Sequence, residues 1–188
     1  MPLPILSAPE FNLVLPSTKK DITYRPFTVK EQKALLIARE SSDTKEIINA
    51  TEKIVSSCTN VELTEVQKMP YFDVEWIFLH IRGKSIGEDF KFVMSHPPED
   101  ECKHKTDISF NLEDIKFELD KDQTVNLQIT DDIGVTFDYP NFGDTLDFAG
   151  LNDPLEMYKF TIKKINSVFD KERVYDDFTL QEAEDFID

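Results

Sequence analysis

The sequence is poor in cysteine and glycine. Its two cysteines, Cys58 and Cys102, lie far apart among 188 residues, which does not fit a disulfide scaffold. Five glycines leave little of the tightly turning backbone that phosphate-binding loops require, and neither a P-loop nor a G-x-G-x-x-G motif is present. Adjacent acids such as Asp131 and Asp132 do not by themselves form a catalytic carboxylate pair. We therefore expect no enzymatic activity, no catalytic residue and no cofactor.

Long apolar runs are missing as well. A membrane-spanning helix needs about 18 or more consecutive apolar residues, and the sequence has no such run. The first residues, MPLPILSAPEF, lack the basic start and the long apolar centre of a signal peptide. We expect the protein to fold in the cytosol, in a reducing environment.

Positive charge is scarce. The chain has 21 Lys and Arg against 37 Asp and Glu, a formal net charge of −16. The imbalance is local, because the net charge is +1 through Cys58 and −17 from Thr59 onward. Nucleic acids and anionic membranes would repel such a chain, so the expected partners are proteins. The acidic part is either a solvated face or a surface that orients the protein on basic neighbours.

The first half of the chain predicts an extended arm, a hairpin and three helices. Prolines at positions 2, 4, 9 and 16 disfavour helix, and the segments FNLVL and DITYRPF alternate as in a hairpin. Thr28 and Glu31 have capping-box spacing and predict a helix over 28–40, and Asp43 begins a second helix over 43–58. Asp73 and Gly83 are the expected ends of a third helix. The first helix is expected to have one apolar side, formed by Ala34, Leu35, Ile37 and Ala38.

The second half predicts a sheet followed by helices. From Asp89 to about residue 139 apolar residues alternate, which indicates an antiparallel meander of four or five short strands. Asp153 and Pro154 predict a helix with an apolar strip to about Phe169, and Thr179 begins a short last helix. The predicted fold class is α+β, with limits at 1–27 (arm and hairpin), 28–88 (helices) and 89–188 (acidic sheet and C-terminal helices). The last two are expected to form one compact unit.

Residues 92–112, FVMSHPPEDECKHKTDISFNL, contain the only clustered metal-ligand candidates. His96, Cys102 and His104 lie between two expected strands. Structural zinc sites commonly use four ligands in two close pairs, and here only Cys102 and His104 are close. We expect a solvated loop and no metal, while a small metal-stabilised domain remains the alternative.

Two long motifs resemble the baseplate hub proteins of T-even-like contractile-tailed phages. The first is DITYRPFTVKEQKALLIARESSD, which matches the pattern YRPF-x-VKE-x-KALL-x-A-x-E and is followed by a helix that ends at Cys58. The second is FDVEWIFLHIRGKSIGE, and the C-terminal VYDDFTLQEAEDFID is similar to the acidic tail of that family. Relatives often carry paired cysteines in the loop between the strands, whereas this chain has only Cys102 there.

The resemblance implies a part in building the hub at the centre of the baseplate, by contacts with other baseplate and tail proteins and possible self-association. Host cytoplasm during assembly and the tail baseplate of the virion are the implied locations. A transient assembly chaperone of the hub that is absent from the mature virion is the alternative. The expected partner-binding residues are Tyr24, Arg25, Pro26, Phe27 and Lys84, because such basic and aromatic side chains anchor interfaces. A local role is the alternative, with Arg25 on Glu31 and Lys84 at a helix end.

Overall fold

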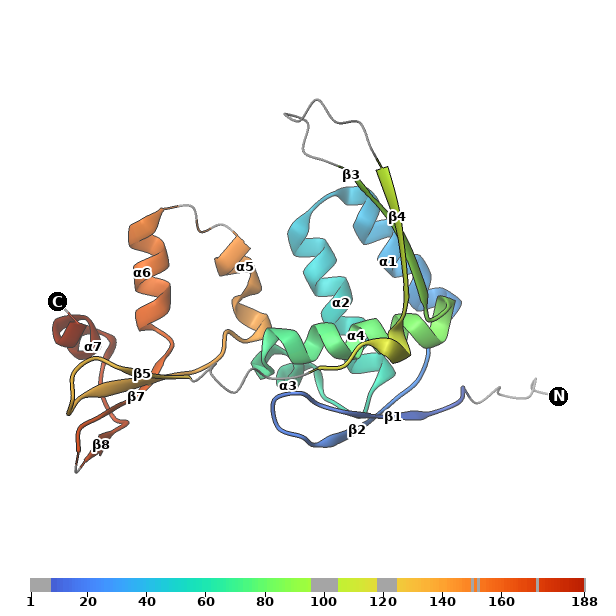
Figure 1. Cartoon of the computed structure of the whole chain (residues 1–188). Helices are drawn as coiled ribbons and strands as arrows, with labels where there is room; N and C mark the ends of the chain where they lie inside the picture. Colours follow the sequence, from blue (N-terminus) through green and yellow to red (C-terminus); the bar gives the residue numbers. More distant parts are fainter. Residues whose placement is uncertain are drawn as a thin grey trace. The chain divides into compact units, whose positions relative to one another are not determined.

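The structure, a computed structural model, describes residues 8–95, 105–117, 125–149, 151, 153–171 and 173–187. By its internal contacts the chain divides into unit 1, residues 1–63 with 72–118, and unit 2, residues 64–71 with 119–188. Each unit is described by itself below. Helices and antiparallel strands together confirm the predicted α+β class (Figure 1). The domain limits expected from the sequence stay a prediction.

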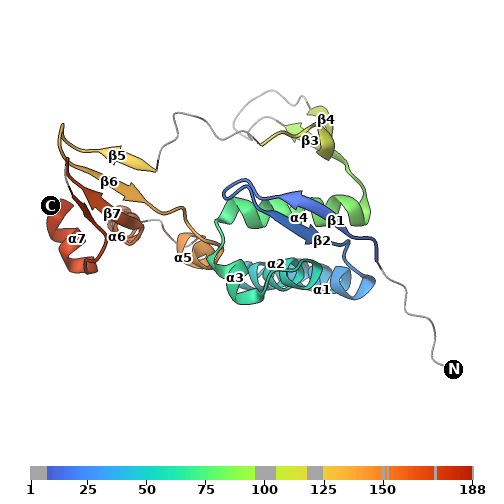
Figure 2. The same ribbon diagram turned by 90° about the horizontal axis from the view of Figure 1, so that it is seen from below.

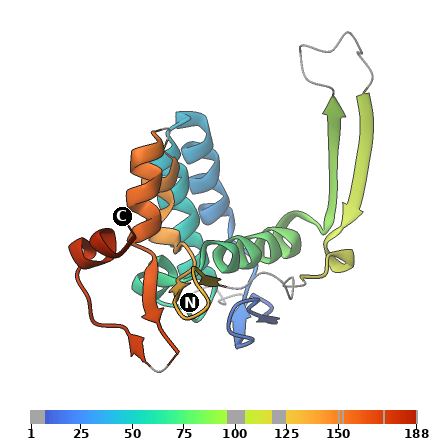
Figure 3. The same cartoon turned by 60° about the vertical axis from the view of Figure 1, so that its left-hand side comes forward.

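Unit 1 is built around helix α4. The hairpin β1–β2 lies on one side of α4, and the helices α1 and α2 lie on the other (Figures 1 and 3). The buried apolar side chains of α4 are Val74, Ile77 and Ile81, each 0% exposed. The elements of this unit are β1 (Phe11–Val14), β2 (Asp21–Tyr24), α1 (Val29–Ser41), α2 (Thr44–Cys58), α4 (Tyr71–Ile86), β3 (Asp89–Ser95), β4 (Lys105–Asn111) and the 3-10 turn η1 (Leu112–Asp114).

The starts of α1 and α2 follow local sequence signals, whereas both ends of α4 were predicted wrongly. Thr28 and Glu31 form the predicted capping box of α1, and the Asp43 side chain accepts from the Lys45 amide at the start of α2. Helix α4, however, begins before Asp73 and continues through Gly83. Gly87, at φ 139°, follows its last residue instead, because only glycine adopts that backbone conformation without strain.

Unit 2 contains a four-stranded antiparallel sheet in the order β5-β6-β7-β8. Figure 2 shows β5, β6 and β7 as neighbours, with α6 and α7 beside β7. Val135, Ile162, Ile165 and Ala183 form the buried core of the sheet and these two helices. The elements are α3 (Leu63–Lys68), β5 (Asn126–Gln128), β6 (Gly134–Phe137), the 3-10 turn η2 (Phe142–Asp144), α5 (Thr145–Ala149), α6 (Pro154–Ile162), β7 (Ile165–Phe169), β8 (Val174–Tyr175) and α7 (Leu180–Ile187).

The predicted single meander is wrong. Strands β3 and β4 pair only with each other among the described residues, whereas β5 and β6 belong to the separate sheet of unit 2. Residues 115–117 are not a strand. The predicted helix to Phe169 is also wrong, because it ends at Ile162 and the chain returns as β7. Pairing of Val168 with Val135 overrides the helical spacing of the apolar residues.

Gly134 gives unit 2 a testable packing constraint. A Cβ atom at this position would collide with the Phe169 ring and lie 2.8 Å from the Leu127 carbonyl oxygen. The ring can turn aside, but the carbonyl belongs to the neighbouring strand β5. We expect Gly134→Ala to lower the free energy of unfolding by about 1–3 kcal/mol, seen as a lower melting temperature. An unchanged melting temperature would contradict this close approach.

Candidate interaction site

The YRPF motif joins the β1–β2 hairpin to α1. Tyr24 ends β2 and is only 3% exposed, with its ring 5.5 Å from Phe11 and 6.2 Å from His80, centroid to centroid. The Phe27 amide donates to the Ser85 hydroxyl oxygen at 2.9 Å. The motif therefore fixes the hairpin and the start of α1 against α4.

Arg25 and Glu31 form a polar cluster at this junction. The guanidinium donates to both carboxylate oxygens at 2.8 and 3.1 Å and to the Ser57 carbonyl oxygen at 2.8 Å. Glu31 also accepts from the Thr28 amide and the Ser57 hydroxyl. These contacts, the Arg25 hydrogen bonds above all, hold the pKa of Glu31 at about 2, below its ordinary 4.5. Arg25 thus links the hairpin exit, α1 and the end of α2.

Lys84 lies near the same junction. Its ammonium pairs with Glu88, and it also lies 5.2 Å from the centroid of the Phe11 ring. The hydrogen bond to Glu88 is the main cause that raises the pKa of Lys84. The side chain is held on the surface of unit 1 by these two local contacts.

The structure therefore brings together the residues expected to bind a partner. Tyr24, Arg25, Pro26 and Phe27 surround the start of α1, and the local Arg25–Glu31 pair considered from the sequence is present. Lys84 pairs with Glu88, which sequence reasoning did not identify. A partner-binding role of the five expected residues stays a prediction.

Ser85 and Cys58 lie at this junction and are of residue types that serve as nucleophiles in enzymes. Gly83-Lys84-Ser85-Ile86-Gly87 has G-x-S-x-G spacing, which in hydrolases places serine on a strained turn between strand and helix. Here Ser85 lies within α4, and its hydroxyl donates to the Ile81 carbonyl oxygen. Cys58 is 2% exposed, and burial raises the pKa of its thiol. The spacing alone therefore does not make an exposed nucleophile of Ser85.

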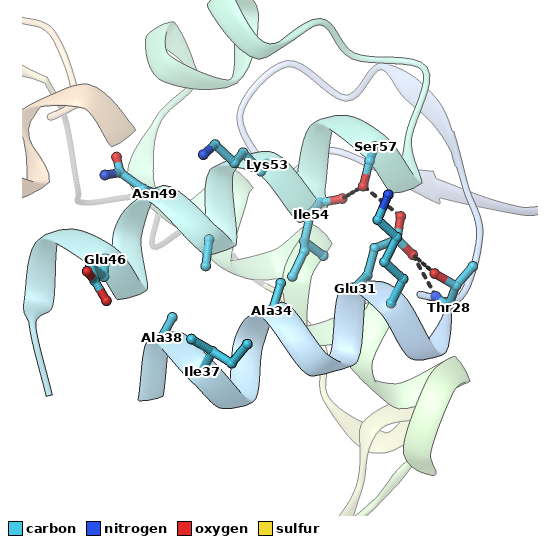
Figure 4. A pocket seen from close by; sticks show the side chains of 12 residues that line it. Thr28, Glu31, Ala34, Ile37, Ala38, Glu46, Asn49, Lys53, Ile54 and Ser57 are labelled. Carbon is cyan, nitrogen blue, oxygen red and sulfur yellow. Dashed lines mark hydrogen bonds between the residues drawn. The ribbon is translucent and has the colours of Figure 1, made fainter. Parts of the chain in front are cut away.

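Sequence reasoning missed two apolar surfaces of unit 1. The first is a groove of about 680 Å³ between α1 and α2, shown in Figure 4. The feature of the sequence that could have indicated this groove is the predicted apolar side of α1. Only Ala38 of that side is buried. We call it the hairpin groove; its apolar lining residues are Ala34, Ile37, Ala38, Ala50 and Ile54.

The second surface is one face of the β3–β4 ribbon, which stands clear of the helices of its own unit in Figure 3. Phe90 and Phe110 stack at 5.1 Å, and the Arg82 guanidinium lies 4.3 Å from the Phe90 centroid. Farther out, Phe92 and Met94 are 45% and 55% exposed. We call this the ribbon face; it consists of Phe90, Phe92, Met94, Thr106, Ile108 and Phe110.

The metal-ligand candidates His96, Cys102 and His104, for which a solvated loop without metal is expected, lie outside the described residues. Within the described ranges, no group of three or more His, Cys, Asp or Glu residues could hold a metal ion. The helices in the described part of the chain are all too short or too polar to cross a membrane.

Comparison with known proteins places the chain in the class of bacteriophage baseplate proteins. The family model described as "T4 bacteriophage base plate protein" matches residues 8–188. The chain belongs to this family, which confirms the resemblance to T-even-like phage baseplate proteins and implies a location in the virion tail. No curated protein and no solved structure matches the chain.

Proposed function

We propose that the chain is a structural component of the baseplate hub and acts without catalysis, by binding neighbouring baseplate proteins. Family membership supports the baseplate setting. The net charge of −16 supports protein partners over nucleic acid or membrane. The observation that carries the proposal is the ribbon face.

A two-stranded ribbon cannot bury its own apolar face, because an apolar sheet face needs a second layer. In the described part of unit 1, β3 and β4 pair only with each other, so each strand also leaves one backbone edge unpaired. Exposed apolar patches and free strand edges are typical of binding sites for another chain. The ribbon face therefore supplies an attachment point for a neighbouring baseplate subunit.

The test compares two adjacent residues on opposite faces of β3. Met94 lies on the ribbon face, and Val93, which is 57% exposed, lies on the other. We expect Met94→Asp to fold but to be lost from purified tails at least about tenfold, because a buried carboxylate weakens an interface strongly. Val93→Asp is the control and should be incorporated like the wild type. Equal incorporation of both variants would rule out the ribbon face as the attachment point.

Mass spectrometry of wild-type particles tests the structural role separately. A built-in hub component should be present in stoichiometric amounts relative to other baseplate proteins. Its absence from mature tails, together with its presence in assembly intermediates, would reject this role and favour the transient chaperone.

A further inference from the structure

At the hairpin groove, an apolar side of α1 is left uncovered by the described residues of unit 1. Helices α1 and α2 run in opposite directions, and small side chains such as Ala34 and Ala38 keep the space between them open (Figure 4). Ile37 is 56% exposed at the edge of this space, whereas Ile54 at its base is 3% exposed. An exposed isoleucine beside alanines matches the knob and hole of helix packing.

The two ends of the groove carry opposite charges that form no ion pair within the described part of the chain. Lys30 is the second residue of α1 and Glu46 the third of α2, so the antiparallel helices place them at opposite ends. Both side chains line the groove and are exposed. Of the remaining charged lining residues, Glu31 is already bound by Arg25, and Lys53 is exposed.

We infer that the groove is the interface for a second copy of this chain. A two-fold axis that lies in the interface and crosses the groove at a right angle brings Glu46 of each copy to the Lys30 end of the other. Ile37 of each copy then packs near Ala34 and Ile54 of the second copy. The result is a bundle of four helices, two from each chain.

Charge favours a second copy at this surface. Residues 28–58 contain five basic and five acidic side chains, whereas the whole chain carries −16. Two copies therefore repel each other least when they meet through α1 and α2, and the charges at the ends of the groove are self-complementary. The two Lys53 side chains lie near each other, but long exposed lysines extend into solvent, where salt screens their repulsion.

The expected dimer is weak because the face is small. Two helices about 20 Å long and about 10 Å wide present about 400 Å² per copy, half of the about 800 Å² typical of stable complexes. We expect a dissociation constant of about 10–500 µM, measurable by sedimentation equilibrium of the full chain at low salt.

Two exposed residues of α1 provide a matched pair of variants. Ile37 lines the groove, and Leu36 is 51% exposed but does not line it. Ile37→Asp should weaken dimerisation at least about tenfold, and Leu36→Asp less than about twofold. Circular dichroism would establish that both variants are folded.

Charge exchange tests the orientation of the two copies. Glu46→Lys and Lys30→Glu should each weaken the dimer about three- to tenfold, and the double variant should recover to within about threefold of the wild type. The differences in dissociation constant between these charge variants and the wild type should become smaller as the salt concentration is raised. A wild-type monomer at every concentration, equal effects of Ile37→Asp and Leu36→Asp, or no recovery in the double variant would each overturn the inference. It does not rest on the proposed function, which is tested on particles with ribbon variants.

Discussion

Replacing Glu31 with glutamine is expected to lower the free energy of unfolding at pH 7 by about 2 kcal/mol. The pKa of about 2 for Glu31 means that its ionised form is favoured in the folded protein over the unfolded chain. A depression of that size corresponds to about 3 kcal/mol, which we reduce because the side chain keeps 17% of its exposure. Glu31→Gln removes the charge and leaves Arg25 without its carboxylate. Chemical denaturation measures the loss.

The control for this variant is Glu40→Gln. Glu40 lies on the same helix and is exposed, so the same change of charge should alter the free energy of unfolding by less than about 0.5 kcal/mol. Equal effects of the two variants would mean that the Arg25–Glu31 pair does not hold the hairpin junction together.

Acid should remove the advantage of the wild type over Glu31→Gln. The folded-state pKa is below the unfolded value, so the contribution is complete above about pH 4.5 and decreases as the pH falls through about 2. The stabilities of the two proteins should therefore converge in that window. NMR titration of the Glu31 carboxyl carbon gives an independent check, and a pKa near 4.5 would contradict the network.

Local signals of a few residues could be recognised from the sequence. The capping box at Thr28 and Glu31, the cap at Asp153 and the box at Thr179 and Glu182 all occur in the structure. In each case the bonded groups lie within three residues, so distant parts of the chain do not decide the outcome. The Arg25–Glu31 pair could be considered for a similar reason, since it spans only six residues.

Features that depend on distant contacts could not be derived. Ile165 and Phe169 fit the apolar spacing of a helix and also the alternation of a strand, and only pairing with β6 decides between them. The hairpin groove was missed because the sequence shows that α1 is apolar on one side but does not show that the other described residues of unit 1 leave this side exposed. The same holds for the ribbon face, whose alternation was predicted correctly but was assigned to a larger sheet.

The second large effect is expected at Asp73, which fastens the β1–β2 hairpin to α4. The residue is 1% exposed, and its carboxylate accepts from the Ser17 amide at 3.0 Å and from the Ser17 hydroxyl. Asp73 also lies in the first turn of α4, where the helix dipole favours a negative charge. Sequence reasoning placed Asp73 in front of the helix as a cap, whereas it serves as an acceptor for another element.

Asp73→Ala should lower the free energy of unfolding by about 2–4 kcal/mol, because two hydrogen bonds to a buried charge are lost and the Ser17 amide remains unpaired. Ser17→Ala removes only the hydroxyl bond and should cost about 1 kcal/mol. The two losses of unfolding free energy should be non-additive, because the first substitution already breaks the hydroxyl hydrogen bond that the second would remove. Hydrogen exchange at the Ser17 amide should accelerate in Asp73→Ala but not in Ser17→Ala. Slow exchange in both variants would show that the hairpin is held against α4 by packing alone.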